Sequence, residues 1–291
     1  MTIAPPQRPV LRAAGWHARE QAHRERADVL TAAHRERASR GEKHPVEDFL
    51  FTYYSYKPTL LRRWHPGAGV DLADAAGTDR ATWRWYTVGG APGSLALDVT
   101  ALRSERGALI DNIGRVLRAT AGRAGSFGCF GLHEWAMVYR ERGHRHEVPL
   151  RLGQEGTDDV VEAHDLRCTH FDAFRFFTPA AVPRNRDAPS RERQADLEQP
   201  GCLHAGMDLY KWAVKLGPLV PGELLLDAFE LARDIRTLDM QASPYDLSDW
   251  GYVAVAVETP EGKAEYVRAQ RGFAERGQIL RARLIDVIDA L

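Results

Sequence analysis

The chain has 291 residues and a net charge of −1, from 39 basic and 40 acidic side chains. This balance excludes a uniformly basic surface, so contact with nucleic acid would have to rest on a local patch. Hydrophobic residues make up 44% of the sequence and charged residues 27%, which is typical of a chain that folds around a core.

Length and segment composition limit the architecture further. A chain of 291 residues can bury most of its apolar surface in one unit, so we expect a single compact domain over 1–291. No run of about 18 apolar residues and no secretory apolar segment is present, which predicts a cytoplasmic protein without a membrane partner. Cys129, Cys168 and Cys202 are too few and too widely spaced for a disulfide framework or a structural zinc site, so we expect reduced thiols.

The first part of the chain predicts helix and then a loop-rich region. Residues 1–41 contain one long polar helix that ends at Gly41 and packs on the body through a thin apolar stripe. A second helix is predicted to begin at Pro45 and to end or kink at Pro58. Residues 69–99 alternate turn formers with aromatic side chains, which indicates a loop around a short strand centred on WRWYTV.

The rest of the chain is mostly helical in pattern. Residues 94–125 predict helix in one or two pieces, and 146–177 predict strand, helix and strand in turn. Residues 178–201 carry prolines and charges without a hydrophobic period, which favours a long surface loop. Further helices are predicted over 129–143, 201–217, 222–243 and 261–291. The fold class predicted is α+β, predominantly α-helical with a small β component.

One stretch, HDLRCTHFDAFRFFTPAA over 164–181, combines phenylalanines with histidine, aspartate and arginine. Phenylalanines at this density belong inside a fold, whereas the charged residues are costly to bury without partners. The stretch therefore straddles the core and its surface or lines a polar site walled by aromatic rings. If it is a strand, His170 and Asp172 point the same way.

A predicted helix adds a second polar cluster. His204 and Asp208 are four residues apart and so share a helix face, which Lys211 extends. Nitrogen and oxygen ligands of this kind suit iron or zinc, although no established ligand spacing is present. The alternative is a set of buried polar groups that bond to one another and to the backbone. The candidate ligands are His133, Glu134, His164, His170, His204 and Asp208.

The stretch FTYYSYKPTLLRRWHPG interleaves aromatic rings with cations. Rings that stack on bases, beside cations that meet phosphates, hold an unstacked nucleotide. Core aromatic residues beside solvated arginines would give the same pattern. The candidate residues are Tyr53, Tyr54, Tyr56, Lys57, Arg62 and Arg63.

Three stretches carry a family resemblance: HPVEDFLFTYYSYKPTLLRRWHPG, THFDAFRFFTPAA, and CLHAGMDLYKWAVKLGPL with LDMQASPYDL. With these motifs the chain resembles an actinobacterial family of cytoplasmic proteins that commonly carry the name 3-methyladenine DNA glycosylase. The resemblance covers nearly the full length. It implies hydrolytic release of alkylated purines from damaged DNA, with no cofactor.

Such a reaction needs a carboxylate near the sugar, aromatic rings for the extruded base and a basic edge for the backbone. Asp172, with His170 and Asp208, is the candidate catalytic group, and Asp239 is a further acid within an apolar helix. The candidate substrate-binding residues are Phe171, Phe174, Arg175 and Lys211 together with the tyrosines and cations of 53–63.

Two other functions fit the same residues. The first is a metal-dependent oxidase or hydrolase that uses non-haem iron or zinc and acts on a small molecule. The second is a binding or scaffold protein without catalytic activity, which fits the long polar N-terminal helix but leaves the clustering of histidine and aspartate unexplained.

Overall fold

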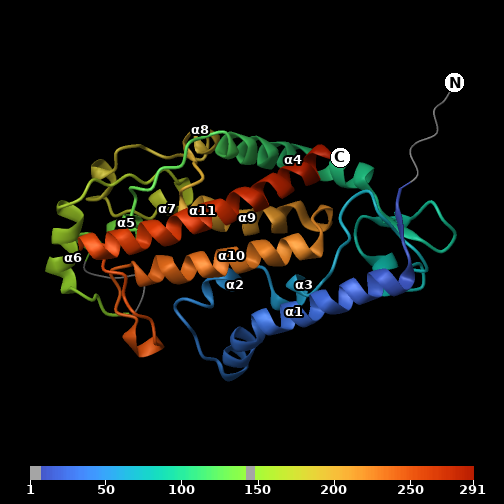
Figure 1. Ribbon diagram of the computed structural model, residues 1–291, viewed down its shortest axis with the longest axis horizontal. Coiled ribbons are helices and arrows are strands. Elements are labelled where there is room, and N and C mark those ends of the chain that lie inside the picture. Colours follow the sequence, from blue (N-terminus) through green and yellow to red (C-terminus); the bar gives the residue numbers. More distant parts are fainter. Residues whose placement is uncertain (1–7, 142–147) are drawn as a thin grey trace.

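A computed structural model describes residues 8–141 and 148–291 of the chain. Three long helices form its centre: α9 (Leu203–Leu216), α10 (Gly222–Gln241) and α11 (Pro260–Asp289) (Figure 1). The helix α10 packs on both α9 and α11, and α4 (Val99–Ala121) packs along α11. Ten of the fourteen residues of α9 are buried, so α9 is the central helix of the core.

A small sheet lies at one end of the molecule, beside the start of α1 (Figure 1). Its strands are β1 (Val10–Leu11), β2 (Asp71–Leu72), β3 (Tyr86–Val88) and β4 (Leu95–Leu97), in the order β1-β2-β4-β3. The pair β1–β2 is parallel, and the other two pairs are antiparallel. The predicted class, a mainly helical α+β fold with a small β component, is confirmed.

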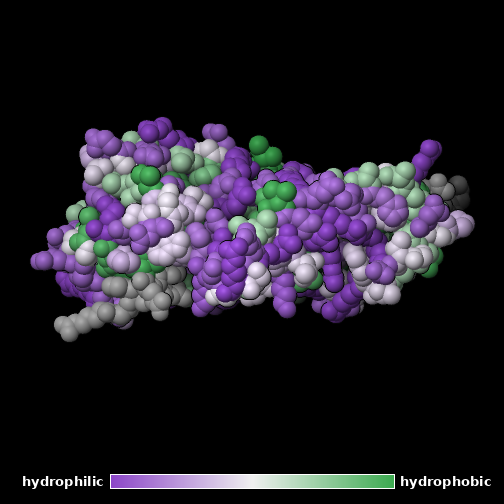
Figure 2. Space-filling model, turned by 90° about the horizontal axis from the view of Figure 1, so that it is seen from below, coloured by the Kyte–Doolittle hydropathy of each residue, from purple (hydrophilic) through white to green (hydrophobic). Residues whose placement is uncertain are grey.

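The polar N-terminal helix is present as α1 (Ala13–Arg40), which ends at Gly41 with φ 72°. It packs on α10 and on α3 (Pro58–Leu61). Ion pairs add to the apolar contacts, because Arg26 pairs with Asp227 at 2.9 Å and with Glu230 at 2.8 Å on α10. The face seen from below, which includes α1, is mostly hydrophilic (Figure 2).

Short helices complete the described fold, and α5, α7 and α8 gather beside α9 and α11, away from the sheet (Figure 1). The short α-helices are α2 (Phe49–Tyr53), α5 (Leu132–Ala136), α6 (Gly153–Glu162), α7 (Phe171–Phe174) and α8 (Gln194–Leu197). The 3-10 helices are Asp79–Thr82, Val182–Arg184, Gly217–Leu219 and Ser248–Trp250.

Two segments differ from their predicted type. The stretch predicted as a second strand within 146–177 contains the helix α7, and Leu166 forms only a single bridge, with Asn185. The first strand predicted there begins outside the described residues. Residues 95–97, predicted as helix, form β4, because all three are buried between β2 and β3. Asp98 then caps α4 by accepting a hydrogen bond from the Ala101 N–H at 2.8 Å.

Several boundaries also differ. The helix predicted from Pro45 begins at Phe49, and Pro58 starts α3 instead of ending the earlier helix. The strand predicted around WRWYTV begins only at Tyr86. The prediction of a surface loop over 178–201 is wrong for its last part. There the chain forms α8, and residues 198–201 are buried.

The described helices include none that is both long enough and apolar enough to cross a membrane.

Two glycines test the packing. An ideal Cβ on Gly222, the first residue of α10, would lie 2.6 Å from Trp64 Cδ1 and 2.8 Å from His23 Nδ1. We expect Gly222→Ala to lower the free energy of unfolding by about 2 kcal/mol through overpacking.

On the exposed side of α11, a Cβ on Gly272 meets nothing within 4 Å. Gly272→Ala should therefore raise the free energy of unfolding by about 0.5 to 1 kcal/mol through helix propensity.

Urea titration of both variants measures the two changes as midpoint shifts at constant slope. Equal effects of the two substitutions would contradict the close packing of His23 and Trp64 against the start of α10.

Candidate metal centre

Two histidines and one aspartate converge in the core from three helices: His133 of α5, His204 of α9 and Asp239 of α10. We refer to them as the first triad. His133 Nε2 lies 2.9 Å from Asp239 Oδ1 in a buried ion pair, and neither atom has a further hydrogen-bond partner within the described part of the chain. The rings of His133 and His204 meet edge to face, with centroids 4.4 Å apart. Buried ionisable groups are costly unless they pair with each other or bind a further group.

Neighbouring side chains hold the first triad in place. Arg236, one turn before Asp239 on α10, donates from Nη1 to Asp239 Oδ2 at 3.2 Å and to Glu134 Oε1 at 3.0 Å. On the other side, Cys129 Sγ lies 3.9 Å from His133 Nδ1. Contacts of this kind orient ligand side chains in metal sites.

The backbone before α5 also matters for His133. Gly131 precedes α5 with φ 72°, a conformation that side chains other than glycine rarely adopt. A Cβ at Gly131 would lie 3.3 Å from the Tyr266 ring of α11. This glycine therefore lets α5 begin close against α11, which brings His133 into the core.

A second triad lies beside the first and consists of His170, Glu198 and Asp208. His170 precedes α7, Glu198 follows α8, and Asp208 is on α9. His170 Nε2 lies 3.1 Å from Asp208 Oδ2 and 3.2 Å from Glu198 Oε1, and all three side chains are at most 3% exposed. Because α9 supplies both His204 and Asp208, one turn apart, the two triads are neighbours along that helix.

The second triad belongs to a larger hydrogen-bond network, although His170 Nδ1 is buried without a partner in the described chain. Lys211 Nζ contacts Asp208 Oδ2 closely and donates to Asp172 Oδ2 at 3.0 Å. The Tyr54 hydroxyl donates to the remaining oxygen, Asp208 Oδ1, at 3.4 Å. Cationic partners therefore already compensate the carboxylate of Asp208.

Electrostatics sets different protonation states for the three histidines. Burial lowers the pKa of His170, but Glu198 and Asp208 outweigh it and raise that pKa to about 9. The pKa of His133 is likewise raised well above its usual value, because Asp239 outweighs the effect of burial. Burial and the neighbouring His133 lower the pKa of His204 far below its usual value. His204 is therefore neutral, which is the form that binds metals.

A cavity of about 350 Å³ opens beside the first triad, and His204 belongs to both. Its polar lining consists of His204, Glu134, Asp172, Arg236 and Thr52. The remaining lining residues are Phe49, Tyr53, Met137, Phe176 and Tyr245. Cavities of this size, mostly apolar with a few convergent polar groups, are typical of small-molecule sites. We refer to it as the aromatic cavity.

The three cysteines, distant in sequence, line one small cavity on the first triad together with His133 and His204. Its volume of about 10 Å³ has room for roughly one water molecule. All three are free thiols, as predicted, and burial raises the pKa of Cys168 and Cys202.

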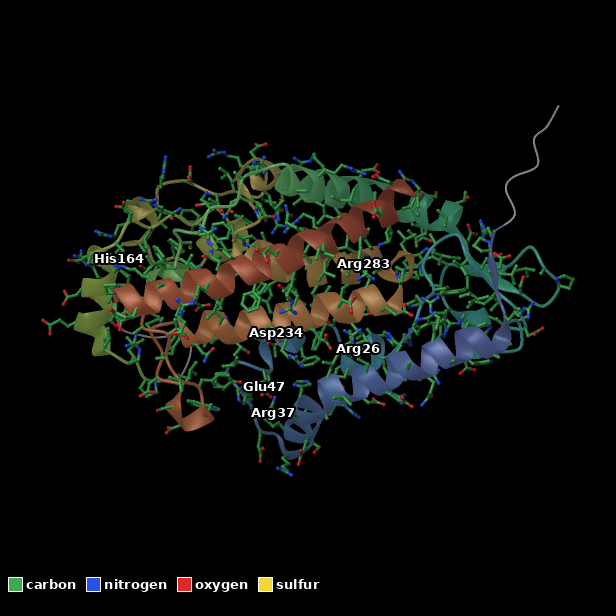
Figure 3. The ribbon with its side chains drawn as sticks, in the orientation of Figure 1. Arg26, Arg37, Glu47, His164, Asp234 and Arg283 are labelled. Carbon is green, nitrogen blue, oxygen red and sulfur yellow. The ribbon has the colours of Figure 1, made fainter. Side chains whose placement is uncertain are left out.

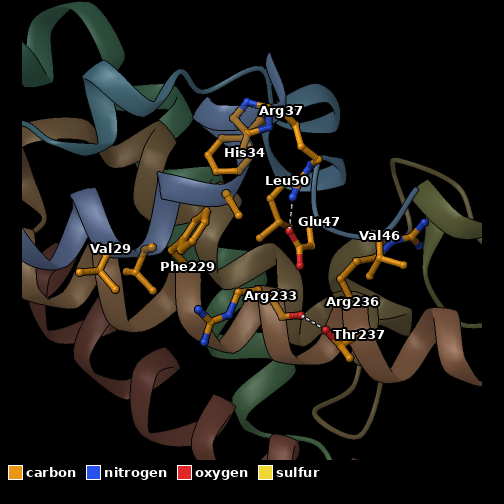
Figure 4. Close-up of a pocket in the computed structure, with 13 residues that line it drawn as sticks. Val29, His34, Arg37, Val46, Glu47, Leu50, Phe229, Arg233, Arg236 and Thr237 are labelled. Carbon is orange, nitrogen blue, oxygen red and sulfur yellow. Dashed lines mark hydrogen bonds and ion pairs between the residues drawn. The ribbon is translucent and has the colours of Figure 1, made fainter. Parts of the chain in front are cut away.

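A further cavity of about 160 Å³ lies between α1, α2 and α10 (Figure 4). Among the described residues that line it, Arg236 is shared with the aromatic cavity, and no member of either triad is included. Arg233 extends along its wall, and Arg37 pairs with Glu47 at 2.7 Å at its edge (Figure 4).

The structure brings many of the predicted site residues together. His170, Asp208, Lys211, Asp172 and Tyr54 form one connected network. Three further predicted site residues, His204, Glu134 and Tyr53, line the aromatic cavity. The predicted ligand His133 belongs to the first triad. Residues 170–172 and 204–208 therefore meet although the sequence separates them by more than thirty positions.

Other predicted residues lie apart from the triads. His164 bonds to the Val160 carbonyl at 2.6 Å and sits beside the end of α6 (Figure 3). Arg175 reaches Asp172 at 3.4 Å, while Phe174 packs on Phe177. The Phe171 ring lies under Arg191.

The predicted nucleotide-binding cations are also separate from the aromatic cavity. Arg62 pairs with Asp28 of α1 at 2.8 Å, and Arg63 lies over the Trp83 ring. Lys57 precedes α3, and Tyr56 packs on Tyr210 in the core. Of the six candidate residues in this stretch, Tyr53 alone is among the described residues that line the cavity.

Sequence analysis missed Glu198 and Arg236 and did not recognise Asp239 as a possible ligand. A signal existed for Asp239, because it interrupts the apolar stripe of a strongly amphipathic helix, where a carboxylate needs a partner. No comparable signal marked Glu198, which lies at the end of a segment predicted as a solvent-exposed loop.

Comparisons with protein-family models, with curated proteins and with solved structures give no match to this chain. The function therefore has to be argued from the geometry of the two triads and the cavity beside them.

Proposed function

We propose that this chain is a metal-dependent enzyme that binds iron or zinc at the first triad and acts on a small molecule in the aromatic cavity. One observation carries the proposal. His133 Nε2 and Asp239 Oδ1 are buried, lie 2.9 Å apart and have only each other as partners within the described chain, and His204 completes their triad at the wall of the cavity.

The donor set fits such an ion. Two histidines and one carboxylate are the protein ligands of many catalytic zinc sites and of the facial triad of non-haem iron enzymes, both of which keep positions open for substrate. When bound, the ion would polarise a substrate oxygen or, as iron, take part in oxidation. The first triad is favoured over the second, because it combines two histidines with one carboxylate and reaches the wall of the cavity through His204.

The surrounding residues have separate tasks in this proposal. Glu134 lines the cavity next to His133 and can accept or return a proton at the substrate. Arg236 fixes the carboxylates of Glu134 and Asp239 relative to each other. The aromatic lining excludes water from the reacting groups.

The glycosylase function implied by the family resemblance stays a second candidate. Asp172 lines the aromatic cavity, so a carboxylate is available near rings that can hold an extruded base. This candidate needs no metal. Release of 3-methyladenine or 7-methylguanine from duplex DNA by folded protein in a chelator would favour it over the metal-dependent enzyme.

Substitutions in the first triad test the metal site. We expect His204→Ala and Asp239→Asn to weaken zinc or iron binding at least about a hundredfold, because each removes a ligand. The matched control is His164→Ala, since His164 belongs to neither triad. Elemental mass spectrometry after dialysis gives the metal content, and circular dichroism checks the fold. Metal retained by folded Asp239→Asn, or lost from His164→Ala, would contradict the assignment.

Metal binding should strengthen as pH rises. The raised pKa of His133 means that this side chain carries a proton in the metal-free protein at neutral pH. A metal must displace that proton, so we expect weaker binding at pH 6 than at pH 8 and release of about one proton per ion. Isothermal titration calorimetry in buffers of different protonation enthalpy counts the proton. Binding independent of pH and of the buffer would show that His133 is not a ligand.

A three-ligand site should also keep an open position. We expect the visible absorption of the cobalt(II)-loaded protein to change on titration with azide, because a small anion can enter that position from the cavity. Tyr53→Trp, which narrows the cavity, should weaken azide binding while cobalt stays bound. A cobalt spectrum insensitive to azide would indicate a closed, structural site.

A further inference from the structure

The aromatic cavity limits the shape of its ligand. Four rings line it, from Phe49, Tyr53, Phe176 and Tyr245, together with the thioether of Met137. These side chains come from α2, from the residue after α5, from the region after α7, and from the connection after α10. The cavity has a volume of about 350 Å³, and its rings come from separate segments of the chain. This arrangement favours a planar ligand of one or two fused rings, which can stack on the aromatic side chains or meet them edge to face.

The acidic residues of this cavity do not require a cationic ligand. Glu134 accepts a hydrogen bond from Arg236 at 3.0 Å. Asp172 is paired with Lys211 at 3.0 Å and with Arg175 at 3.4 Å. Because each carboxylate already has a cation in contact, a positively charged ligand would meet these cations as well as the acids.

Hydrogen-bond donors, by contrast, are in excess at Arg236. A guanidinium group has five N–H donors and no acceptor. Its Nη1 serves both Glu134 and Asp239, whereas Nε is buried and has no partner in the described chain. Arg236 is 2% exposed and lies 4.0 Å over the Phe49 ring, which fixes its plane against one wall of the cavity. A donor of Arg236 is therefore free for a ligand acceptor.

A metal ion bound at the first triad would add to the positive charge near Arg236. This part of the inference rests on the proposed function. A divalent cation brings two positive charges to a triad with a single carboxylate, Asp239. The loaded triad and Arg236 then lie together at the polar end of a cavity walled by rings. A bound anion would neutralise this buried net positive charge most directly.

We propose that the aromatic cavity binds the carboxylate of an aromatic acid, with the ring among Phe49, Tyr53, Phe176 and Tyr245 and the carboxylate toward Arg236 and the first triad. The substrate class of the enzyme is then an aryl carboxylic acid. An aromatic amine or amide of the same shape binds less tightly, because neither supplies negative charge.

Three naphthalene probes of matched shape test this selectivity by quenching of intrinsic fluorescence: 2-naphthoate, 2-naphthamide and 2-naphthylmethylamine. On zinc-loaded protein we expect 2-naphthoate to bind at least about tenfold more tightly than the amide, since the carboxylate forms an ion pair where the amide offers only a neutral acceptor. The amine should bind more weakly still. An amide or amine that binds as tightly as 2-naphthoate would overturn the inference, as would loaded protein that binds none of the probes.

Variants separate the contributions. Arg236→Gln should remove most of the preference for 2-naphthoate over the amide. If that variant does not fold, Glu134→Gln tests the same point, because it frees Arg236 from one acid and should tighten 2-naphthoate severalfold. Tyr53→Ala should weaken 2-naphthoate and the amide equally. Arg233→Gln, on the same helix but lining the other cavity, is the control and should change nothing.

Metal-free protein distinguishes failure of this inference from failure of the proposed function. If zinc does not bind, the proposed function fails, and Arg236 alone still predicts that 2-naphthoate binds more tightly than the amide. If zinc binds but the preference for carboxylate is absent, the metal centre stands and the inference fails.

Discussion

The burial of ionisable side chains along α9 and α10 is the constraint on which the rest of the structure depends. His204, Asp208 and Asp239 lie on helices that otherwise form the apolar core, where an unpartnered charge is costly. The chain meets this cost by bringing short helices to the core: α5 supplies His133, and the segments around α7 and α8 supply His170 and Glu198. The irregular stretches between the long helices are therefore held in place by the polar centre as much as by apolar packing.

The two triads meet the same constraint differently. In the second, protonated His170 and Lys211 pair with the carboxylates. In the first, Arg236 pairs with one oxygen of Asp239, while the other lies 2.9 Å from His133 Nε2. We propose that the first triad holds a metal ion and that the second supports it. The two triads share helix α9. His204 and Asp208 lie one turn apart on it, so a shift of the helix at Asp208 would also move His204.

The sequence predicts the long helices because hydrophobic period and glycine or proline boundaries are local properties: α1, α9, α10 and α11 all follow them. Short elements depend on tertiary contacts. Residues 95–97 match a helical pattern but become a strand between two partners, and 171–174 form a helix because His170 and Asp172 are held by α9. For the site, the density of histidine, aspartate and phenylalanine pointed to 164–181 and 204–211. Glu198 could not be found in this way, because its role depends on where a proline-rich segment re-enters the core.

Crystals of the zinc-loaded protein, measured on both sides of the zinc absorption edge, test the central claim most directly. An anomalous difference map locates the ion without reference to any assumed function. The account predicts one strong peak about 2.0 to 2.2 Å from His133 Nε2, from a ring nitrogen of His204 and from Asp239 Oδ1. Zinc found at surface residues only, with His133 still directly against Asp239, would contradict it.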